Sequence, residues 1–326
     1  MPRRTRPHLF LALALAAHAL WAAPASAQQA ALPPLIKIVV PFAAGASTDV
    51  AARAVAAELS KRLGSNVIVE DMPGASTYIG AAAVAKAPKD GSVLLMTSSS
   101  TFTAAATKRS VPFDVNSDLL PVAQLSEGPL IIAASAQNDI RTPADLVAAA
   151  RARPDEITHG TGGIGTLSHV AAEMINDAAK IQLKHIPYKG AALAVSDFVA
   201  GRIDLMIGVY TTVAPQVKAG RARLIAVTTP RPHPAFPGVP TMASAAPGLA
   251  LGIWVGFFAP VGTPAAVVQR LNRELGEVAR SRAVLDVIEP DGSTPSALSP
   301  EEFAATVRNS YAAWKKLATE KNIVVE

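Results

Sequence analysis

The chain of 326 residues is 50% hydrophobic and 5% aromatic, and it holds 30 Lys and Arg against 25 Asp and Glu but no cysteine. The lack of cysteine excludes a disulfide framework, a thiol nucleophile and a cysteine-based metal site. The net charge of +5 comes without basic stretches interleaved with aromatic residues, so no nucleic-acid partner is expected.

The first 27 residues have the pattern of a secretory signal peptide. Three arginines precede an apolar run at 9–23, and Ala25, Ser26 and Ala27 place small residues at a cleavage site. We expect cleavage near Ala27 and a periplasmic mature chain, the alternative being a retained membrane anchor. Loss of the three arginines leaves 27 basic and 25 acidic side chains, so much of the basic character belongs to the discarded segment.

After this segment, short β-branched runs alternate with alanine-rich helical patterns. The predicted strands are 36–40, 66–70 and 92–97, and the predicted helices between them are 48–63 and 78–87. This β-α-β-α-β order implies a parallel sheet with helices on its faces.

The same order of elements returns further along the chain. Its predicted strands are 156–160, 181–188 and 203–208, and its predicted helices are 166–179 and 191–201. Strands at 120–126 and 129–135 lead into this second unit, and strands at 222–229 and 251–260 lead back. Helices at 264–281 and 299–321 complete the chain, the latter opened by the capping-box pair Ser299 and Glu302.

These elements predict an α/β protein of two lobes, each a mostly parallel sheet flanked by helices. The predicted domains are the signal peptide 1–27, a discontinuous lobe 1 of 28–127 plus 252–326, and lobe 2 of 128–251, with crossovers near 123–131 and 228–252. Ligands in open α/β sheets bind beyond the carboxyl ends of the strands, so two facing lobes predict a cleft.

The stretch HGTGGIGTLSH at 159–169 has glycines spaced as in a dinucleotide-binding turn. The next predicted strand ends in KHIPYKG at 184–190, without the acid that would bind ribose hydroxyls, so no cofactor is expected. Glycines still allow close backbone approach, and a helix N-terminus still attracts an anion. The stretch therefore predicts an anion cradle with hydroxyl donors at Thr161, Thr166 and Ser168, the alternative being a plain glycine turn.

Two more hydroxyl-rich loops follow predicted strands. The loop 41–50 runs through a glycine into a helix and offers Ser47 and Thr48, and the cluster TSSST lies at 97–101. Simple helix capping and a solvated loop are the alternatives. Three uncharged donor loops at strand ends favour capture of an anion through neutral hydrogen bonds.

At these loops the sequence resembles the Bug/TctC-type substrate-binding proteins of tripartite tricarboxylate transporters. The matching stretches cover nearly the whole mature chain and are 40–56, 67–91, 159–173, 186–206, 217–229 and 257–272. The resemblance implies a two-lobed periplasmic binding fold of type II that closes on a small carboxylate. It also implies delivery to one large and one small integral membrane subunit. The receptor itself is expected to be a monomer.

The resemblance places the ligand between the loop from Phe42 to Asp49, the wall at Thr97 and Ser98, and the loop from Thr161 to His169. The predicted ligand-binding residues are Phe42, Ala43, Ala44, Gly45, Ser47, Thr48, Asp49, Tyr78, Thr97, Ser98, Thr161, Gly162, Gly163, Thr166, Ser168, His169, Tyr188 and Tyr210.

The chain departs from the family pattern at three places. The first loop has Ala44-Gly45-Ala46-Ser47 where the family has Pro-Gly-Gly-Pro, Tyr78 stands where an Asn is common, and Gly208-Val209-Tyr210 lacks the acid of Phe-Asp-Asn. The missing acid argues against an amino-acid ligand, whose ammonium group needs a counter-charge. Tyr78 and Tyr210 instead favour a bulkier or aromatic acid.

An enzyme is the rival class. Ser168 and His169 are adjacent, so on a helix their side chains diverge by about 100° and do not form a nucleophile–base pair. The histidines at 159, 169, 185 and 233 lack metal-ligand spacing, so no metal and no catalytic residue are expected. A periplasmic sensor acting with a signalling partner, or a receptor for another transporter type, stays open as an alternative.

Overall fold

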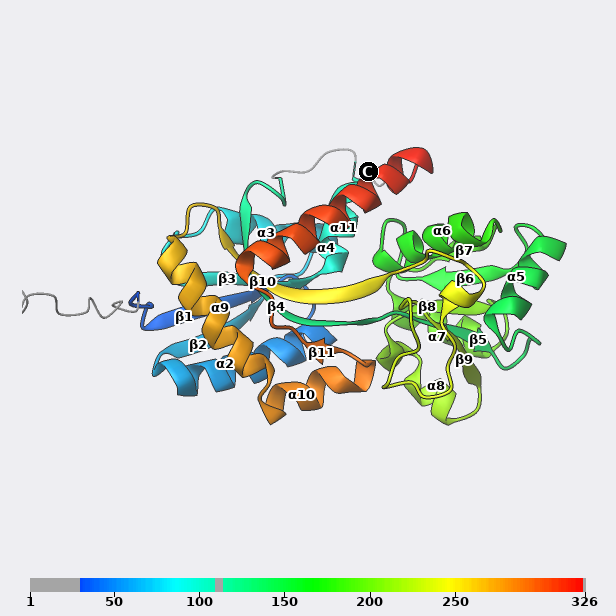
Figure 1. Ribbon diagram of the computed structural model, residues 1–326, viewed down its shortest axis with the longest axis horizontal. Coiled ribbons are helices and arrows are strands. Elements are labelled where there is room, and N and C mark those ends of the chain that lie inside the picture. The colour runs from blue at the N-terminus through cyan, green and yellow to red at the C-terminus, as the bar shows by residue number, and fades with distance from the viewer. Residues whose placement is uncertain (1–29, 109–113, 325–326) are drawn as a thin grey trace, which may run out of the picture. The chain divides into compact units, whose positions relative to one another are not determined.

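The computed structural model describes residues 30–108 and 114–324, and residues 32–326 form one compact unit (Figure 1). The predicted signal peptide at 1–27 lies outside the described residues. Within the compact unit two sheets flanked by helices form two lobes, which confirms the predicted two-lobed α/β fold. The prediction that each sheet is mostly parallel is wrong, because both sheets are mixed and antiparallel pairs make up at least half of the pairings in each. We use lobe 1 for the first sheet with its helices and lobe 2 for the second.

The sheet of lobe 1 has six strands in the order β11-β4-β10-β3-β1-β2. They are β1 (Leu35–Val40), β2 (Asn66–Asp71), β3 (Val93–Ser98), β4 (Leu119–Pro129), β10 (Gly252–Pro260) and β11 (Thr294–Pro295). Strand β1 is parallel to both β2 and β3, whereas β10 is antiparallel to β3 and β4. The helices are α2 (Ser47–Leu63), α3 (Tyr78–Ala85), α4 (Ser99–Thr107), α9 (Ala265–Ala279), α10 (Arg282–Ile288) and α11 (Pro300–Glu320), with the short turns η1 (Ala75–Thr77) and η4 (Glu289–Asp291).

The sheet of lobe 2 has five strands in the order β7-β6-β8-β5-β9. They are β5 (Ile131–Ser135), β6 (Thr158–Thr161), β7 (Lys184–Pro187), β8 (Leu205–Gly208) and β9 (Ala222–Val227). Strand β6 is parallel to β7 and β8, and β5 is antiparallel to β8 and β9. The helices are α5 (Pro143–Ala152), α6 (Leu167–Ala179), α7 (Ala191–Val199) and α8 (Ala214–Lys218), with the turns η2 (Tyr210–Thr212) and η3 (Met242–Ser244).

The antiparallel strands in each sheet arise where the chain crosses from one lobe to the other. The chain enters lobe 2 in β5 and returns to lobe 1 in β10, and each arriving strand runs against its neighbours. The strands derived from the predicted β-α-β units run parallel, as expected. Figure 1 shows β4 and β10 side by side, and their pairing extends from Leu119 with Pro260 to Pro129 with Gly252.

Helix α4 was not predicted, because its sequence SSTFTAAAT looks like a polar loop. In the structure its threonine hydroxyls are buried and bond back to the helix: Thr103 donates to the carbonyl of Ser100 and Thr107 to that of Thr103. Such back-bonding satisfies hydroxyls that would otherwise disfavour burial. Helices α5 and α10 were also missed, whereas the capping box of Ser299 and Glu302 is confirmed at the start of α11.

The core of lobe 1 contains a cluster of four buried aromatic residues. Phe102 of α4 contacts Phe258 and Trp254 of β10, with ring centroids 5.1 and 5.2 Å away, and Phe303 of α11 contacts the same two rings at 5.4 and 5.5 Å. Phe102, Phe258 and Phe303 are fully buried. The cluster thus fixes α4 and α11 against the central strand of the sheet.

Contacts between side chains join the two lobes beyond the crossing strands. The backbone N–H and hydroxyl of Thr211 donate to the carboxylate of Asp291, at 2.7 and 3.2 Å. Beside them, a Cβ added at Gly292 would lie 2.7 Å from the ring of Phe236. Thr211 and Phe236 of lobe 2 therefore lie close against Asp291 and Gly292 of lobe 1.

Candidate functional site

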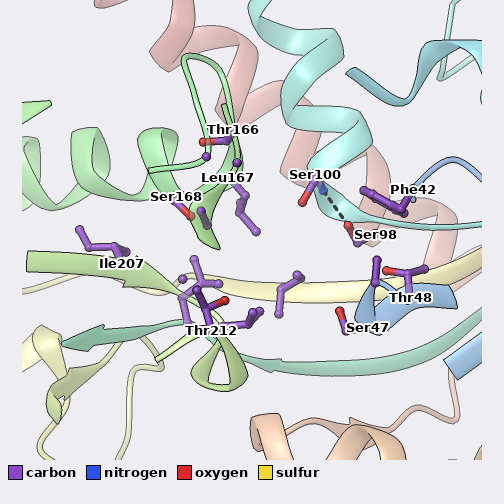
Figure 2. A pocket seen from close by; sticks show the side chains of 18 of the residues that line it. Phe42, Ser47, Thr48, Ser98, Ser100, Thr166, Leu167, Ser168, Ile207 and Thr212 are labelled. Atoms are coloured by element: carbon purple, nitrogen blue, oxygen red, sulfur yellow. Dashed lines mark hydrogen bonds between the residues drawn. The ribbon is translucent and has the colours of Figure 1, made fainter. Parts of the chain in front are cut away.

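A cavity of about 620 Å³ lies between lobe 1 and lobe 2 at the carboxyl ends of β1, β3 and β8. Figure 2 shows side chains from both lobes pointing into it. Its size suits a small organic molecule. Among the described residues that line it, none carries a charge, and nine are serine or threonine.

The first wall is the loop between β1 and α2, where Phe42, Ala46, Ser47 and Thr48 line the cavity. Ala46 is the N-cap of α2 and provides no side-chain cap, so the first N–H groups of the helix face this loop without a local acceptor. The loop itself is held from behind: the backbone N–H of Gly45 donates to Asp49 at 2.8 Å.

Asp49 therefore supports the loop and does not line the cavity. Its carboxylate is almost fully buried and pairs with Arg53, at 2.7 Å. Arg53 also pairs with Asp71 at the end of β2, at 2.7 Å. Burial, followed by the charge of Asp49, raises the pKa of Asp71. One arginine shared by two carboxylates ties α2 to β2 and leaves no charge directed at the cavity.

The second wall is the N-terminus of α4. Ser98 is its N-cap and accepts a hydrogen bond from the backbone N–H of Ser100, at 3.3 Å. Figure 2 shows both serines beside Phe42 and Thr48. Thr97 lies one residue behind, fully buried, and its hydroxyl bonds to that of Thr101 at 2.6 Å. Ser98 and Ser100 thus line the cavity and Thr97 does not.

The third wall is the glycine loop before α6, of which Gly162, Gly165, Thr166, Leu167 and Ser168 line the cavity. It is strongly bonded within itself, since Thr166 caps α6 and donates to the carbonyl of Gly163 at 2.8 Å. A Cβ at Gly162 would lie 3.2 Å from the backbone nitrogen of Ala191, the first residue of α7. Because Gly162 has no side chain, the N-terminus of α7 can lie close to the glycine loop before α6.

Behind the glycine loop lies a stack of three histidine rings. The ring of His185 lies 3.9 Å from that of His169 and 5.0 Å from that of His159, nearly parallel to both. The Nε2 atom of His185 bonds to the hydroxyl of Thr161 at 2.6 Å, and Nδ1 of His169 accepts from the backbone N–H of Gly165 at 3.1 Å. The stack thus contacts the glycine loop through Thr161 and Gly165 and does not line the cavity.

These histidines are held neutral. Burial lowers the pKa of His159 to about 3 and that of His185 to about 4, and burial also lowers the pKa of His169. His159 is fully buried, and neither of its ring nitrogens has a hydrogen-bond partner among the described residues. His169, which was predicted to bind ligand, lies outside the cavity lining and accepts a hydrogen bond from the loop at Gly165.

Four helix N-termini border the cavity. The first residues of α2 and α4 line it from lobe 1, and those of α6 and α7 line it from lobe 2. Each helix N-terminus carries a partial positive charge and unpaired N–H groups. Four such ends around a cavity without charged side chains favour a carboxylate bound by neutral donors.

Most of the rest of the lining is apolar, apart from Ser76, Thr77 and Thr212. Ile207 and Val209 at the end of β8 line it, together with Ile131 at the crossing into lobe 2 and Ile253 on β10. Strand β8 was predicted and the segment Gly208-Val209-Tyr210 at its end was singled out, but the apolar residues Ile207 and Val209 were not named as part of the site.

The structure brings together seven of the predicted ligand-binding residues: Phe42, Ser47, Thr48, Ser98, Gly162, Thr166 and Ser168. The other eleven lie outside the lining: Ala43, Ala44, Gly45, Asp49, Tyr78, Thr97, Thr161, Gly163, His169, Tyr188 and Tyr210. Ser76, Thr77, Ser100, Gly190 and Thr212 line the cavity and were missed. Gly190 follows the predicted strand 181–188 as a turn glycine, so its position was a usable signal.

The three predicted tyrosines have other neighbours. Tyr78 is almost fully buried under Lys108, whose Nζ lies 4.7 Å from the ring centroid. The hydroxyl of Tyr188 donates to Asp197 at 2.7 Å, and the ring of Tyr210 packs edge-on against Phe236 at 5.2 Å. None of the three belongs to the cavity lining.

Ser168 and His169, the adjacent residues weighed as a nucleophile and base, have different surroundings in the structure. His169 is engaged with Gly165, while Ser168 next to it faces the cavity. No group of three or more His, Asp or Glu within 30–108 and 114–324 is placed to hold a metal ion. The helices found in the same ranges are all too short or too polar to span a bilayer.

Residues 51–323 match the model of the tripartite tricarboxylate transporter family receptor, TctC. The chain is 38% identical over 289 residues to a UPF0065 protein of Bordetella bronchiseptica, covering 88% of this chain and 86% of the relative.

Two solved structures share the fold and more than a quarter of the sequence. R. palustris Rpa4515 with adipate is 30% identical, with a TM-score of 0.78, covering 89% of this chain and 98% of that one. MatC from Rhodopseudomonas palustris with bound malate is 27% identical, with a TM-score of 0.74, covering 87% and 98%.

Proposed function

The chain belongs to the family of tripartite tricarboxylate transporter receptors, and we propose that it captures a small organic carboxylate between its lobes and delivers it to a membrane transporter. The family resemblance inferred from the sequence is thereby confirmed, and periplasmic solute binding is the activity of this family. The ligand class, the transporter and the residues that bind the ligand belong to the proposal.

The observation that carries the proposal is the meeting of four helix N-termini on one uncharged cavity. Lobe 1 supplies the ends of α2 and α4, and lobe 2 supplies those of α6 and α7. A carboxylate held there lies near the partial positive charge of helix ends from both lobes and accepts hydrogen bonds from free hydroxyl groups of lobe 1. The adipate and malate bound to the two related proteins support an organic acid as the ligand.

The proposal includes how the chain works in the cell. A signal peptide ending near Ala27 directs it to the periplasm, where it acts as a monomer without enzymatic activity. The lobes, with boundaries near 123–131 and 228–252, close on the acid because the closed form binds it more tightly. The closed form then docks on one large and one small integral membrane subunit.

Replacement of Thr48 by valine is expected to weaken binding of the acid about 10- to 100-fold, because a hydrogen bond to a charged group contributes about 1.5–3 kcal/mol. Thr48 is only 8% exposed at the start of α2, and among the described residues its hydroxyl makes no hydrogen bond within the protein. Titration calorimetry with the tightest acid found in a thermal-shift screen measures the effect.

The matched control is Thr306→Val, which removes an exposed hydroxyl that bonds only to the carbonyl of Glu302 in α11. It is expected to leave affinity unchanged. Equal affinity of Thr48→Val and the parent protein would place the acid elsewhere. A screen in which no carboxylate raises the melting temperature would refute the proposal itself.

A further inference from the structure

The cavity has two chemically different walls, and their difference points to the shape of the ligand. Hydroxyl groups gather on the lobe 1 side, at Ser47, Thr48, Ser98 and Ser100. Branched and sulfur-containing side chains gather at β8 and at the crossing strands, and they are Leu130, Ile131, Met206, Ile207, Val209 and Ile253. Figure 2 shows the lobe 1 hydroxyls together on one side of the cavity and Ile207 on the other.

From this we infer that the preferred ligand is a monocarboxylate with an apolar body, its carboxylate on the lobe 1 hydroxyls and its body on the apolar wall. The inference rests on the proposed function, because it names the ligand class of the same cavity.

The lobe 1 hydroxyls form one complete anchor. Ser98 accepts from the N–H of Ser100 and keeps its own proton available, and the hydroxyls of Ser47, Thr48 and Ser100 make no bond to other described residues. They stand at the ends of two helices, α2 and α4. Two carboxylate oxygens accept about four hydrogen bonds, which this group is able to supply.

Lobe 2 has fewer free hydrogen-bond donors for a second carboxylate. The hydroxyls of Thr161 and Thr166 are already engaged, and the N–H groups of Gly163, Gly165 and His169 donate within the loop. The partial positive charge at the N-termini of α6 and α7 still favours an anion. The free hydroxyls of lobe 2 that face the cavity, however, are those of Ser168 and Thr212.

The apolar wall makes it costly to bind a second charged group of the ligand. Met206 and Ile207 are almost fully buried, and Val209 lies where a strand end opens into the cavity. A carboxylate or ammonium laid against these side chains loses water without gaining a partner, whereas a methylene chain or ring gains by burial. The same wall disfavours amino acids and hydroxy acids with several carboxylates.

Hexanoate and adipate test the inference, since they share a six-carbon chain and differ in one end group. Calorimetry on the full mature chain is expected to show hexanoate binding at least 10-fold more tightly than adipate, with benzoate also preferred over malate. Adipate binding as tightly as hexanoate, or more tightly, would overturn the inference and leave the proposed function standing. If no carboxylate binds, the proposed function itself fails.

The variant Val209→Lys places an ammonium group on the apolar wall. It is expected to reverse the preference, so that adipate binds more tightly than hexanoate. The matched control, Val261→Lys, makes the same change at a 44% exposed position outside the cavity and is expected to keep the parent preference. An unchanged preference in a folded Val209→Lys protein would show that the ligand body does not lie on this wall. Should that variant not fold, the comparison of hexanoate with adipate on the parent decides alone.

Discussion

Lowering the pH from 7.5 to 4.5 is expected to reduce the free energy of unfolding by on the order of 5 kcal/mol, chiefly through the stacked histidines. Unfolded histidines titrate near 6.5, whereas His159 and His185 in the folded chain titrate at about 3 and about 4. Each pH unit between these values is equivalent to about 1.4 kcal/mol per histidine. Two such groups account for most of the expected change.

The sign follows from which state binds protons. Below pH 6.5 the unfolded chain takes up protons at these rings, and the folded chain does not until the pH approaches 4. Stability is therefore fully present above pH 6.5 and is lost as the pH falls toward 4. Burial is the largest cause for each ring, and His169 adds to the effect in the same direction. Glu173 and Lys321 line an outer pocket together with His169 and His185.

The variant His159→Leu isolates this effect. Because neither ring nitrogen has a partner among the described residues, leucine breaks no hydrogen bond seen in the structure. Urea unfolding at the two pH values is expected to show a difference smaller by about 2–3 kcal/mol than in the parent. Phe198→Leu, a buried change without a titrating group, is expected to lower stability by the same amount at both. Equal pH dependence in His159→Leu and the parent would contradict the role assigned to the stack.

Replacement of Phe258 by alanine is expected to lower the free energy of unfolding by about 3–5 kcal/mol, the usual cost of removing a fully buried phenylalanine. Phe258 is 0% exposed in the middle of β10 and touches Phe102, Trp254 and Phe303. Loss of this ring leaves a cavity between α4, α11 and the sheet, and chemical denaturation at neutral pH measures the cost.

The Phe258→Ala change is also expected to weaken ligand binding. Helix α4 carries Ser98 and Ser100 at its start and rests on the aromatic cluster through Phe102, so a loosened cluster also weakens binding of the acid. Ile68→Ala, at a 38% exposed position on β2, is the control and is expected to change stability by under about 1 kcal/mol. A Phe258→Ala protein as stable as this control would show that the cluster is not the centre of lobe 1.

Much of the fold could be predicted from local sequence patterns, because runs of β-branched residues that alternate with alanine-rich helices are typical of parallel β-α-β units. Helix α4 was not, since its hydroxyl-rich sequence becomes helical only when the carbonyls inside the helix and the core satisfy it. The donor loops were found because hydroxyls and glycines between a strand and a helix have few other uses.

Which side chains of those loops face the cavity was less predictable. Thr161 and Ser168 look equivalent in sequence, yet Thr161 turns back to His185 and Ser168 lines the cavity. Tyr210 looked like a ligand contact but packs on Phe236, which comes from a proline-rich loop distant in the chain. The apolar wall could not be predicted either. The sequence of a buried strand such as β8 has the same pattern whether its end packs into a core or lines a cavity.

The place of β10 in the sheet of lobe 1 also bears on how the chain assembles. This strand lies between β3 and β4, yet residues 130–251 separate it from β4 along the chain. All five strands of lobe 2 come from that intervening stretch, so a polypeptide leaving the ribosome completes the second sheet while the first still lacks its middle. Until residues 252–260 emerge, β3 and β4 each present an open edge to the solvent, and such edges pair readily with other chains. We therefore expect the nascent chain to be prone to aggregation through these two edges until residues 252–260 emerge.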